Sequence, residues 1–396
     1  MPVLRPSGSD FTSFVKAAAQ YVPAGSTAKV SKSGGVSVAL PGLGAVVRTS
    51  QVGALASPST SAVIINGVTP QPAVVAAAIR VLLGIVTTLG SASFSYPAGV
   101  AVIPSSGVIV VADQYSHCIR LVTPLGVVTT LAGSGSIAFA DGTGTGASFN
   151  YPAAVAMIPS TGDIAVSDTN NHRIRLVTPG GVVTTLAGSG TAQFADGTGP
   201  AASFYFPYGV AVTSTGVIVV ADTGNNRIRL VNPTSGVVTT LAGNDTGTFA
   251  DGTGAAARFN GPNGVAVIPS SGVIVVADTG NHRIRLVTPA GVVTTLAGSG
   301  SPAFADGTGA LASFSNPTGV AVTSTGDIVV ADKDNHRIRL VTYPGGVVTT
   351  LAGSTGTFAD GTGAGARFNQ PRGVAVTPTG DVVVADTFNN RIRLIV

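Results

Sequence analysis

The sequence predicts an all-β protein built as a six-bladed β-propeller, and three observations lead to that prediction. Gly and Pro account for 53 and 24 of the 396 residues, and Val and Thr recur in short runs, as expected for short strands joined by tight turns. All 17 acidic residues are Asp and only four residues are Lys, so residues that favour helices are scarce. A motif centred on Asp recurs at a nearly constant period, which indicates a solenoid or a propeller.

The repeated motif reads "ADTGNHRIRLV" at residues 277–287. Its six Asp residues are spaced 54 to 56 residues apart and are Asp113, Asp168, Asp222, Asp278, Asp332 and Asp386. Each repeat contains four strand-like runs, of the types "GVAV", "VIVVAD", "RIRLVT" and "GVVTTLAG". The runs are β-branched and bounded by Gly, Pro, Asp or Asn, as strands are. Four antiparallel strands per repeat is the pattern of a propeller blade.

The strand count also predicts how the ring closes. A first "IVTTL" run, residues 85–89, precedes any opening strand, and the last repeat stops after its third run, at residues 391–396. We therefore expect residues 85–89 to form the outer strand of the sixth blade. This 3+1 closure would cover an otherwise open sheet edge.

The motif resembles the NHL repeat, whose Asn-His turn corresponds here to Asn281 and His282 followed by Arg283. The longer pattern "TTLAGSG…FADGTG…ASF..P.GVAV" is also similar to that of NHL propellers, over residues 85–396. The resemblance implies a module that binds ligands or partners, in a family that also includes a few lyases and relatives of lactonases. Because one fold supports several functions, it does not fix the activity.

The Asp, His and Arg residues of the motif are predicted to be structural. All four His residues occupy one turn position, where the third and sixth repeats have Asn226 and Asn390. Equivalent positions on separate blades diverge, whereas a metal site needs ligands that converge on one ion. We therefore expect no metal and no cofactor, with Arg paired to Asp between blades. The His residues concerned are His117, His172, His282 and His336.

The segment "FADGTG" occurs five times and is also interpreted as structural. One Asp per segment is too few for a calcium loop, so we expect a Phe buried beneath the loop and an Asp-Gly turn. A second Phe, of the Phe149 type, would anchor the other end of the segment. The first repeat lacks the segment, and this gap is a predicted docking place for the N-terminal part of the chain.

Function is better sought where the repeats differ. The polar turns and the long loops should share one end of the blades, called the long-loop face, where the residues flanking each inner-strand Pro would ring the channel mouth. The first three repeats supply aromatic residues and the others polar residues, an arrangement that suits an amphipathic peptide or a small ligand. The predicted binding residues are Tyr96, Tyr151, Tyr205, Phe206, Tyr208, Asn263, Asn316, Thr318, Gln370 and Arg372.

Catalytic residues are not predicted. Lactonase-type relatives use an acidic, metal-bearing channel mouth, but no carboxylate occurs at these positions, and the His residues belong to the turns. A hydrolase or lyase acting in the channel is kept as an alternative interpretation. RNA binding is a second alternative, and the net charge of −1 over residues 85–396 argues against it. Nucleic acid is thus not an expected partner.

Residues 1–70 are expected to be a docking segment, in a part of the chain that has a surplus of positive charge. Residues 1–84 have a net charge of +5. The pattern predicts a short helix at residues 9–22, then Ser/Gly/Val-rich strands such as "GVSVAL", "AVVRTS" and "SAVIING", with residues 71–84 as a linker. The longest apolar run, residues 73–86, has 14 residues and contains Arg80, so no membrane span is expected.

The sequence as a whole favours a non-enzymatic binding or scaffold module. It would present the long-loop face and channel mouth to a protein or peptide and attach through residues 1–70 to a larger assembly, such as a virus particle. The first residues lack the apolar core of a secretory signal. We therefore expect a cytoplasmic or particle-associated protein.

Overall fold

The computed structural model describes residues 27–30, 36–39, 46–49, 84–89 and 94–396. In this part of the chain the regular elements are strands and 3-10 turns of three residues, which confirms the all-β prediction. No helix of the described part is long and apolar enough to cross a membrane. The chain divides into two compact units, Met1–Gly84 and Ile85–Val396.

The first unit contains a three-stranded antiparallel sheet with the order β1-β2-β3. Its strands are β1 (Thr27–Val30), β2 (Val36–Ala39) and β3 (Val46–Thr49). The second and third coincide with the predicted strands "GVSVAL" and "AVVRTS". The expected helix at residues 9–22, the strand at 61–67 and the linker up to residue 83 lie outside the described residues.

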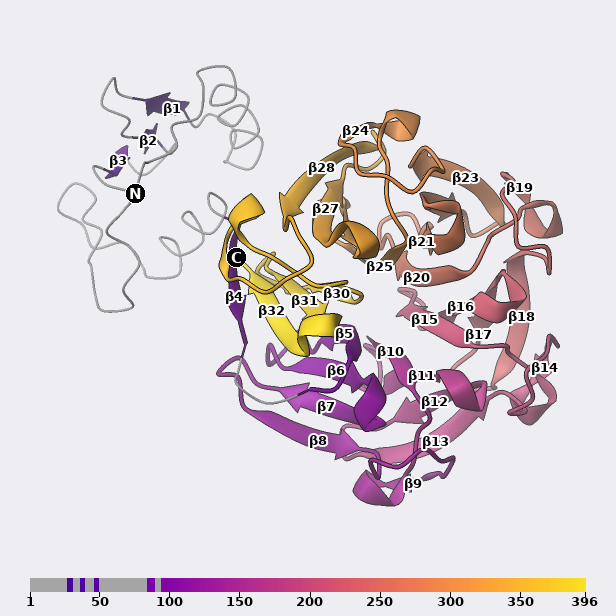
Figure 1. Cartoon of the computed structure of the whole chain (residues 1–396). Helices are drawn as coiled ribbons and strands as arrows, with labels where there is room; N and C mark the ends of the chain where they lie inside the picture. The colour runs from indigo at the N-terminus through magenta and orange to yellow at the C-terminus, as the bar shows by residue number, and fades with distance from the viewer. Residues whose placement is uncertain (1–26, 31–35, 40–45, 50–83, 90–93) are drawn as a thin grey trace. The chain divides into compact units, whose positions relative to one another are not determined.

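The second unit is a ring of six antiparallel sheets, seen along its axis in Figure 1. From the inner to the outer strand, blade 1 is β5 (Pro97–Val102), β6 (Ile109–Asp113), β7 (Cys118–Val122) and β8 (Val128–Ala132). Blade 2 is β10 (Pro152–Met157), β11 (Ile164–Asp168), β12 (Arg173–Val177) and β13 (Val182–Ala187), and blade 3 is β15 (Pro207–Val212), β16 (Ile218–Asp222), β17 (Arg227–Val231) and β18 (Val237–Gly243). Blade 4 is β20 (Pro262–Val267), β21 (Ile274–Asp278), β22 (Arg283–Val287) and β23 (Val292–Ala297), and blade 5 is β25 (Pro317–Val322), β26 (Ile328–Asp332), β27 (Arg337–Val341) and β28 (Val347–Ala352).

Blade 6 closes the ring as predicted. Its first three strands are β30 (Val374–Val376), β31 (Val382–Asp386) and β32 (Arg391–Ile395), and its outer strand is β4 (Ile85–Thr88). β4 pairs antiparallel with β32, with Val86 opposite Ile395. In Figure 1 the indigo β4 lies beside the yellow β32, so the two ends of the propeller share one sheet. The 3+1 closure is confirmed.

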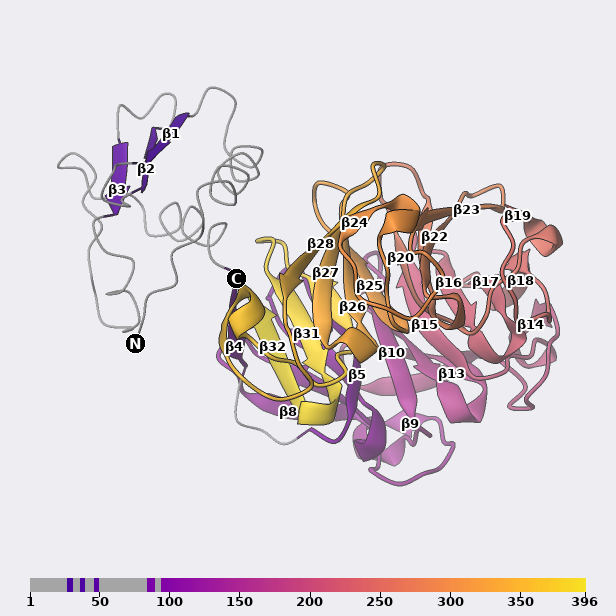
Figure 2. The same cartoon turned by 45° about the horizontal axis from the view of Figure 1, so that its top comes forward.

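Blades 2 to 6 contain a fifth strand that the sequence did not indicate. The Gly-Thr of each FADGTG segment pairs with the first residues of the outer strand, as Gly142 does with Val183 in blade 2. The segments therefore lie along the outer edges of the blades instead of standing out from the long-loop face. The five short strands are β9 (Gly142–Thr143), β14 (Gly197–Thr198), β19 (Gly252–Thr253), β24 (Gly307–Thr308) and β29 (Gly361–Thr362). Figures 1 and 2 label four of them, β9, β14, β19 and β24, which lie at the periphery of the ring in Figure 1.

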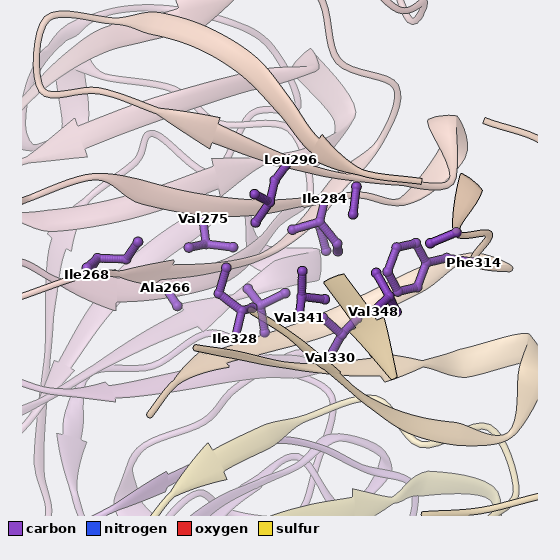
Figure 3. Close-up of a cluster of buried hydrophobic side chains, with 14 residues drawn as sticks. Ala266, Ile268, Val275, Ile284, Leu296, Phe314, Ile328, Val330, Val341 and Val348 are labelled. Atoms are coloured by element: carbon purple, nitrogen blue, oxygen red, sulfur yellow. The ribbon is translucent and has the colours of Figure 1, made fainter. Parts of the chain in front are cut away.

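The hydrophobic core lies between blades. Between blades 4 and 5, aliphatic side chains of both sheets pack together, with Phe314 at one end of the cluster (Figure 3). Strands that are buried on both faces read as continuous apolar runs, which explains the fully buried "IVVAD" strands such as β26. Similar clusters fill the other interfaces, including the one between blades 6 and 1.

Candidate functional site

The repeated Asp at the end of each second strand is buried, and in blades 2 to 6 both of its carboxylate oxygens accept hydrogen bonds. In blade 2, Asp168 Oδ1 accepts a hydrogen bond from the Asn150 N–H at 2.8 Å, and Oδ2 accepts one from Asn171 Nδ2 at 2.9 Å. Nη1 of Arg175 lies 2.6 Å from the same Oδ2, with both side chains excluded from solvent. Ion pairs of 2.6–2.7 Å join the corresponding residues of blades 3 to 6, namely Arg229 with Asp222, Arg285 with Asp278, Arg339 with Asp332, and Arg393 with Asp386.

The Asp of each FADGTG segment binds the same Arg from outside. Nη2 of Arg175 lies 2.6 Å from Asp141 Oδ1, and the guanidinium packs 4.8 Å from the Phe139 ring centroid and 5.2 Å from that of Phe149. The expectation that the first Phe is buried beneath the loop is wrong. Phe139 is 44% exposed, because it covers the guanidinium of Arg173 at 3.9 Å. The second Phe, Phe149, is fully buried.

Six hydrogen bonds, here called latches, join each blade to the next around the ring. The residue that ends each 3-10 turn has a left-handed backbone, with φ between 53° and 56°, a conformation in which Asn and His are enriched. Its side chain accepts a hydrogen bond from the N–H of the residue before the next inner-strand Pro. The His latches, at 3.1–3.2 Å, are His117 to Tyr151, His172 to Phe206, His282 to Asn316, and His336 to Gln370. The Asn latches, at 2.8 Å, are Asn226 to Gly261 and Asn390 to Tyr96.

The His latches should make the stability of the propeller depend on pH. Each His accepts through Nδ1, which must stay unprotonated, and burial lowers the pKa of all four imidazoles below the ordinary value. In the unfolded chain His titrates near 6.5, so the unfolded state takes up protons first as the pH falls. Stability is therefore complete above about pH 6.5 and declines below it, by about 1 kcal/mol for each lost latch.

A variant that carries Asn at all four positions tests this prediction, because Asn forms the latch in blades 3 and 6. We expect urea unfolding to give the same stability for both proteins at pH 8. Between pH 6.5 and pH 5 the native protein should lose more stability than the His→Asn variant. Equal losses in the two proteins would show that the imidazoles do not carry the pH dependence.

The channel mouth brings together three of the residues predicted to bind. Arg372 of blade 6 donates from Nη1 to the Tyr208 hydroxyl of blade 3 at 2.6 Å, and from Nη2 to the Tyr96 hydroxyl of blade 1 at 2.7 Å. The guanidinium also lies 4.7 Å from the centroid of the Tyr96 ring. Burial raises the pKa of the Tyr96 hydroxyl, so this phenol is a neutral acceptor and Arg372 carries the charge of the contact.

Arg372 has no carboxylate partner in the described part of the chain, in contrast to the paired Arg residues of the blades. Its Nε atom is buried without a hydrogen bond. The guanidinium is partly desolvated and its partners are two phenol hydroxyls, so it still attracts an anion. The mouth of the channel is therefore a positively charged centre.

An aromatic patch lies beside this centre and comprises Tyr96, Tyr115, Tyr151 and Phe388. Tyr96 stacks on Tyr115 at 4.4 Å and contacts Phe388 edge-on at 4.8 Å, while Tyr115 meets Tyr151 at 5.2 Å. Tyr115 and Phe388 are 50% and 44% exposed. These two residues were not predicted from the sequence. They lie two positions after the motif Asp, where blades 3 and 4 have Gly, and this difference between repeats could have identified them.

The remaining predicted residues make other contacts. Tyr205 and Phe206 form a separate aromatic pair at 4.9 Å. Thr318 is buried and donates to the Arg372 carbonyl oxygen at 3.1 Å, and Asn316 donates to the Asp334 carboxylate. Asn263 is partly exposed, and Gln370 contributes its N–H to a latch.

The channel is lined by the inner strands of all six blades. Its cavity has a volume of about 240 Å³, and the lining residues, such as Val155, Met157 and Ala211, are all Val, Ala or Met. A lining of this kind supplies no general acid or base. Among the described residues, no group of three or more His, Cys or Asp side chains is placed to hold a metal ion.

The family model described as "NHL repeat" matches six segments, one in each blade. They are residues 94–120, 149–175, 204–229, 259–285, 314–339 and 368–393. The chain therefore contains a six-bladed β-propeller in which every blade is built on the same repeated hairpin. The propeller belongs to the NHL-repeat family.

Known proteins similar to this chain include both binding proteins and enzymes. It is 30% identical over 292 residues to NHL repeat-containing protein 2 of Gallus gallus, and it covers 39% of that protein and 63% of itself in the match. Among solved structures, an auxiliary nutrient binding protein of Bacteroides thetaiotaomicron has a TM-score of 0.61 at 18% identity, over 79% of this chain and 76% of that one. A gluconolactonase of Xanthomonas campestris has a TM-score of 0.54 at 12% identity, over 78% and 88%. These structural likenesses show the fold, which does not choose between binding and catalysis.

Proposed function

We propose that the propeller is a non-enzymatic binding module that presents its long-loop face and channel mouth to a protein or peptide. The observation that carries this proposal is Arg372, a guanidinium without a carboxylate partner in the described chain, beside the exposed aromatic patch. Arg and Tyr are the residues most enriched at the energetic centres of protein interfaces. The ligand that fits is an acidic segment with apolar or aromatic neighbours.

The geometry of the mouth favours binding because the residues are already fixed in place. Tyr96 and Tyr151 are held by latches from the preceding blades, and Arg372 is held by two phenol hydroxyls. Side chains that are ordered before binding lose less entropy when the ligand arrives. A rigid cationic centre between aromatic rings can therefore recognise a carboxylate with little rearrangement.

Attachment to a larger assembly is proposed to occur through residues 1–70. The basic surplus of residues 1–84 contrasts with the nearly neutral propeller, and basic segments are attracted to acidic surfaces. In this arrangement the propeller displays the binding face, and the first residues of the chain supply the anchor to a scaffold such as a virus particle.

Selection from a library of random displayed peptides on the full chain tests the binding site. We expect the enriched peptides to carry Asp or Glu near an aromatic or aliphatic residue. Affinity for such a peptide should fall at least tenfold in Arg372→Gln, since a charge-assisted hydrogen bond contributes about 1.5–3 kcal/mol. Tyr208→Phe, which removes one hydroxyl that holds Arg372, should weaken binding to a smaller extent.

Ser105→Ala is the matched control, because Ser105 is exposed in the turn at the opposite end of blade 1. Its affinity for the selected peptides should equal that of the native chain. Peptides that bind native protein and Arg372→Gln equally would remove the channel mouth from the proposal. Enrichment of nucleic acid with a steep loss of affinity in salt would favour RNA binding instead.

A further inference from the structure

Blade 1 is the one described blade whose outer strand has no fifth strand beside it. Its sheet is β5-β6-β7-β8, whereas each of the other five sheets carries a Gly-Thr strand on its outer edge. In blades 2 to 5 the loop is also held by the N–H of its second Gly, which donates to the carbonyl of the turn Gly, as Gly144 does to Gly181 at 2.9 Å. The corresponding edge of blade 1, at Val127 and Val128, is unpaired in the described chain.

Apolar side chains are exposed at this edge, at the start of β8 and in the turn before it. Val128 is partly exposed, whereas its equivalents Val86, Val183, Val238, Val293 and Val348 are at most 1% exposed. Val127 is 57% exposed. Leu125, which stands where blade 2 has Gly180, is 93% exposed. Natural sheets normally cover such an edge or protect it with charges.

The same edge contains an Arg and a Thr whose equivalents in blade 2 bind the carboxylate of the loop Asp. In blade 2 the loop carboxylate of Asp141 lies between Arg175 at 2.6 Å and the Thr185 hydroxyl at 3.0 Å. The corresponding residues of blade 1 are Arg120 and Thr130, which face each other across β7 and β8. Arg120 is partly exposed and, within the described residues, forms no ion pair.

Behind Arg120, the carboxylate of Asp113 also lacks the partner that its equivalents have. Asp113 Oδ1 accepts from the Ser95 N–H at 2.7 Å, but Oδ2 is buried without a hydrogen bond. In blades 2 to 6 the same oxygen receives the Arg guanidinium at 2.6–2.7 Å. In those blades one guanidinium bridges the motif Asp and the loop Asp, so the loop carboxylate helps to hold the Arg against the motif Asp.

We propose that the outer edge of blade 1 is a docking site for an extended, Asp-containing segment of a partner protein. The segment adds a strand beside Val127 and Val128 and places its carboxylate between Arg120 and Thr130. Strand addition supplies backbone hydrogen bonds for affinity, and the side-chain pockets supply selectivity. The five FADGTG segments of this chain define the chemistry that fits, because each makes this contact in its own blade.

The aromatic residue that precedes the Asp in FADGTG is less important for a segment that binds blade 1. In blade 2 the Phe that precedes the Asp covers Arg173, but blade 1 has Cys118 at that position. Cys118 is buried, and its thiol donates to the Gly133 carbonyl oxygen at 3.4 Å. The closer of the two guanidinium contacts made by that Phe, 3.9 Å to Arg173 against 4.8 Å to Arg175, has no counterpart in blade 1. The partner segment is therefore of the type Asp-Gly-Thr-Gly, and an aromatic residue before the Asp contributes little.

A labelled peptide with the sequence of residues 355–368, which contains "FADGTG", serves as the probe for the full-length chain. Fluorescence anisotropy should show saturable binding. Replacing the Asp of the peptide by Asn, or Arg120 of the protein by Gln, should weaken binding at least tenfold. Replacing the Phe before the Asp by Ala should change affinity less than threefold, and Leu125→Ser should weaken binding a few-fold.

One further variant and one further measurement separate this site from its alternatives. Arg372→Gln should bind the probe as the native chain does, so failure at this edge is distinct from failure at the channel mouth. Absence of binding to the native chain, or equal binding by Arg120→Gln, contradicts the proposal. If sedimentation shows that the full chain self-associates and that Arg120→Gln dissociates it, the edge serves a second copy of this chain and the partner proposal is wrong.

Discussion

Replacing Asp278 by Asn should lower the free energy of unfolding by about 3–5 kcal/mol. The substitution preserves shape but places an amide where Arg285 Nη1 and Asn281 Nδ2 both donate, at 2.6 and 2.9 Å. Arg285 is fully buried and keeps only the half-exposed carboxylate of Asp251 as a charged partner. Breaking one side of a buried ion pair is costly because the remaining charge stays desolvated. Urea unfolding at pH 8 gives the measurement.

The chain contains its own control for this substitution. Asp113 occupies the same position in blade 1 and is equally buried, but no Arg reaches its Oδ2 atom. Asp113→Asn should therefore cost less than about 1 kcal/mol, because the new amide meets no guanidinium and the Ser95 hydrogen bond to Oδ1 is retained. Equal losses for Asp113→Asn and Asp278→Asn would mean that the carboxylate contributes through local turn geometry, not through the ion pair.

Much of the fold could be predicted from the sequence, because a propeller repeats local patterns at a fixed period. The Asp spacing gave the number of blades, and the unmatched "IVTTL" run indicated the closure later seen between β4 and β32. Each of these features depends on residues close together in one repeat, or on counting. The fifth strands could not be found in this way. Gly142 and Thr143 are too short a run to indicate a strand, and the contacts that hold the segment against blade 2, the Arg175–Asp141 ion pair and the Gly144–Gly181 hydrogen bond, join residues far apart in the sequence.

The candidate site was harder to predict than the fold, because its contacts join residues of different blades. The Pro-flanking positions identified Tyr96, Tyr208 and Arg372 as variable, and an aromatic side facing a polar side was expected. In the structure Arg372 of blade 6 donates to Tyr208 of blade 3, on the opposite side of the ring, and to Tyr96 of the adjacent blade 1, residues 164 and 276 positions away in sequence. The length of an Arg side chain and the radius of the ring decide that contact, and neither can be read from one repeat.

Replacing Val86 by Asp should open the propeller at its closure. Val86 lies in β4, is fully buried and belongs to the core cluster shared by blades 5 and 6. A carboxylate there would lose its hydration without gaining a partner, so we expect a loss of about 4 kcal/mol or more. Because β4 completes the sheet that holds the last strand, β32, the damage should appear as proteolysis near the C-terminal end as well as in urea unfolding.

Val128→Asp in β8 tests whether Val86→Asp loses stability because the ring closure opens or because a charge enters the hydrophobic core. Val128 is the equivalent residue of blade 1, but its strand has an open edge and its side chain is partly exposed. A carboxylate at Val128 can stay hydrated, so its cost should be about 1–2 kcal/mol, without proteolysis at residues 391–396. Similar losses in both variants would show that the core between blades, and not the shared sheet of β4 and β32, limits the stability of the ring.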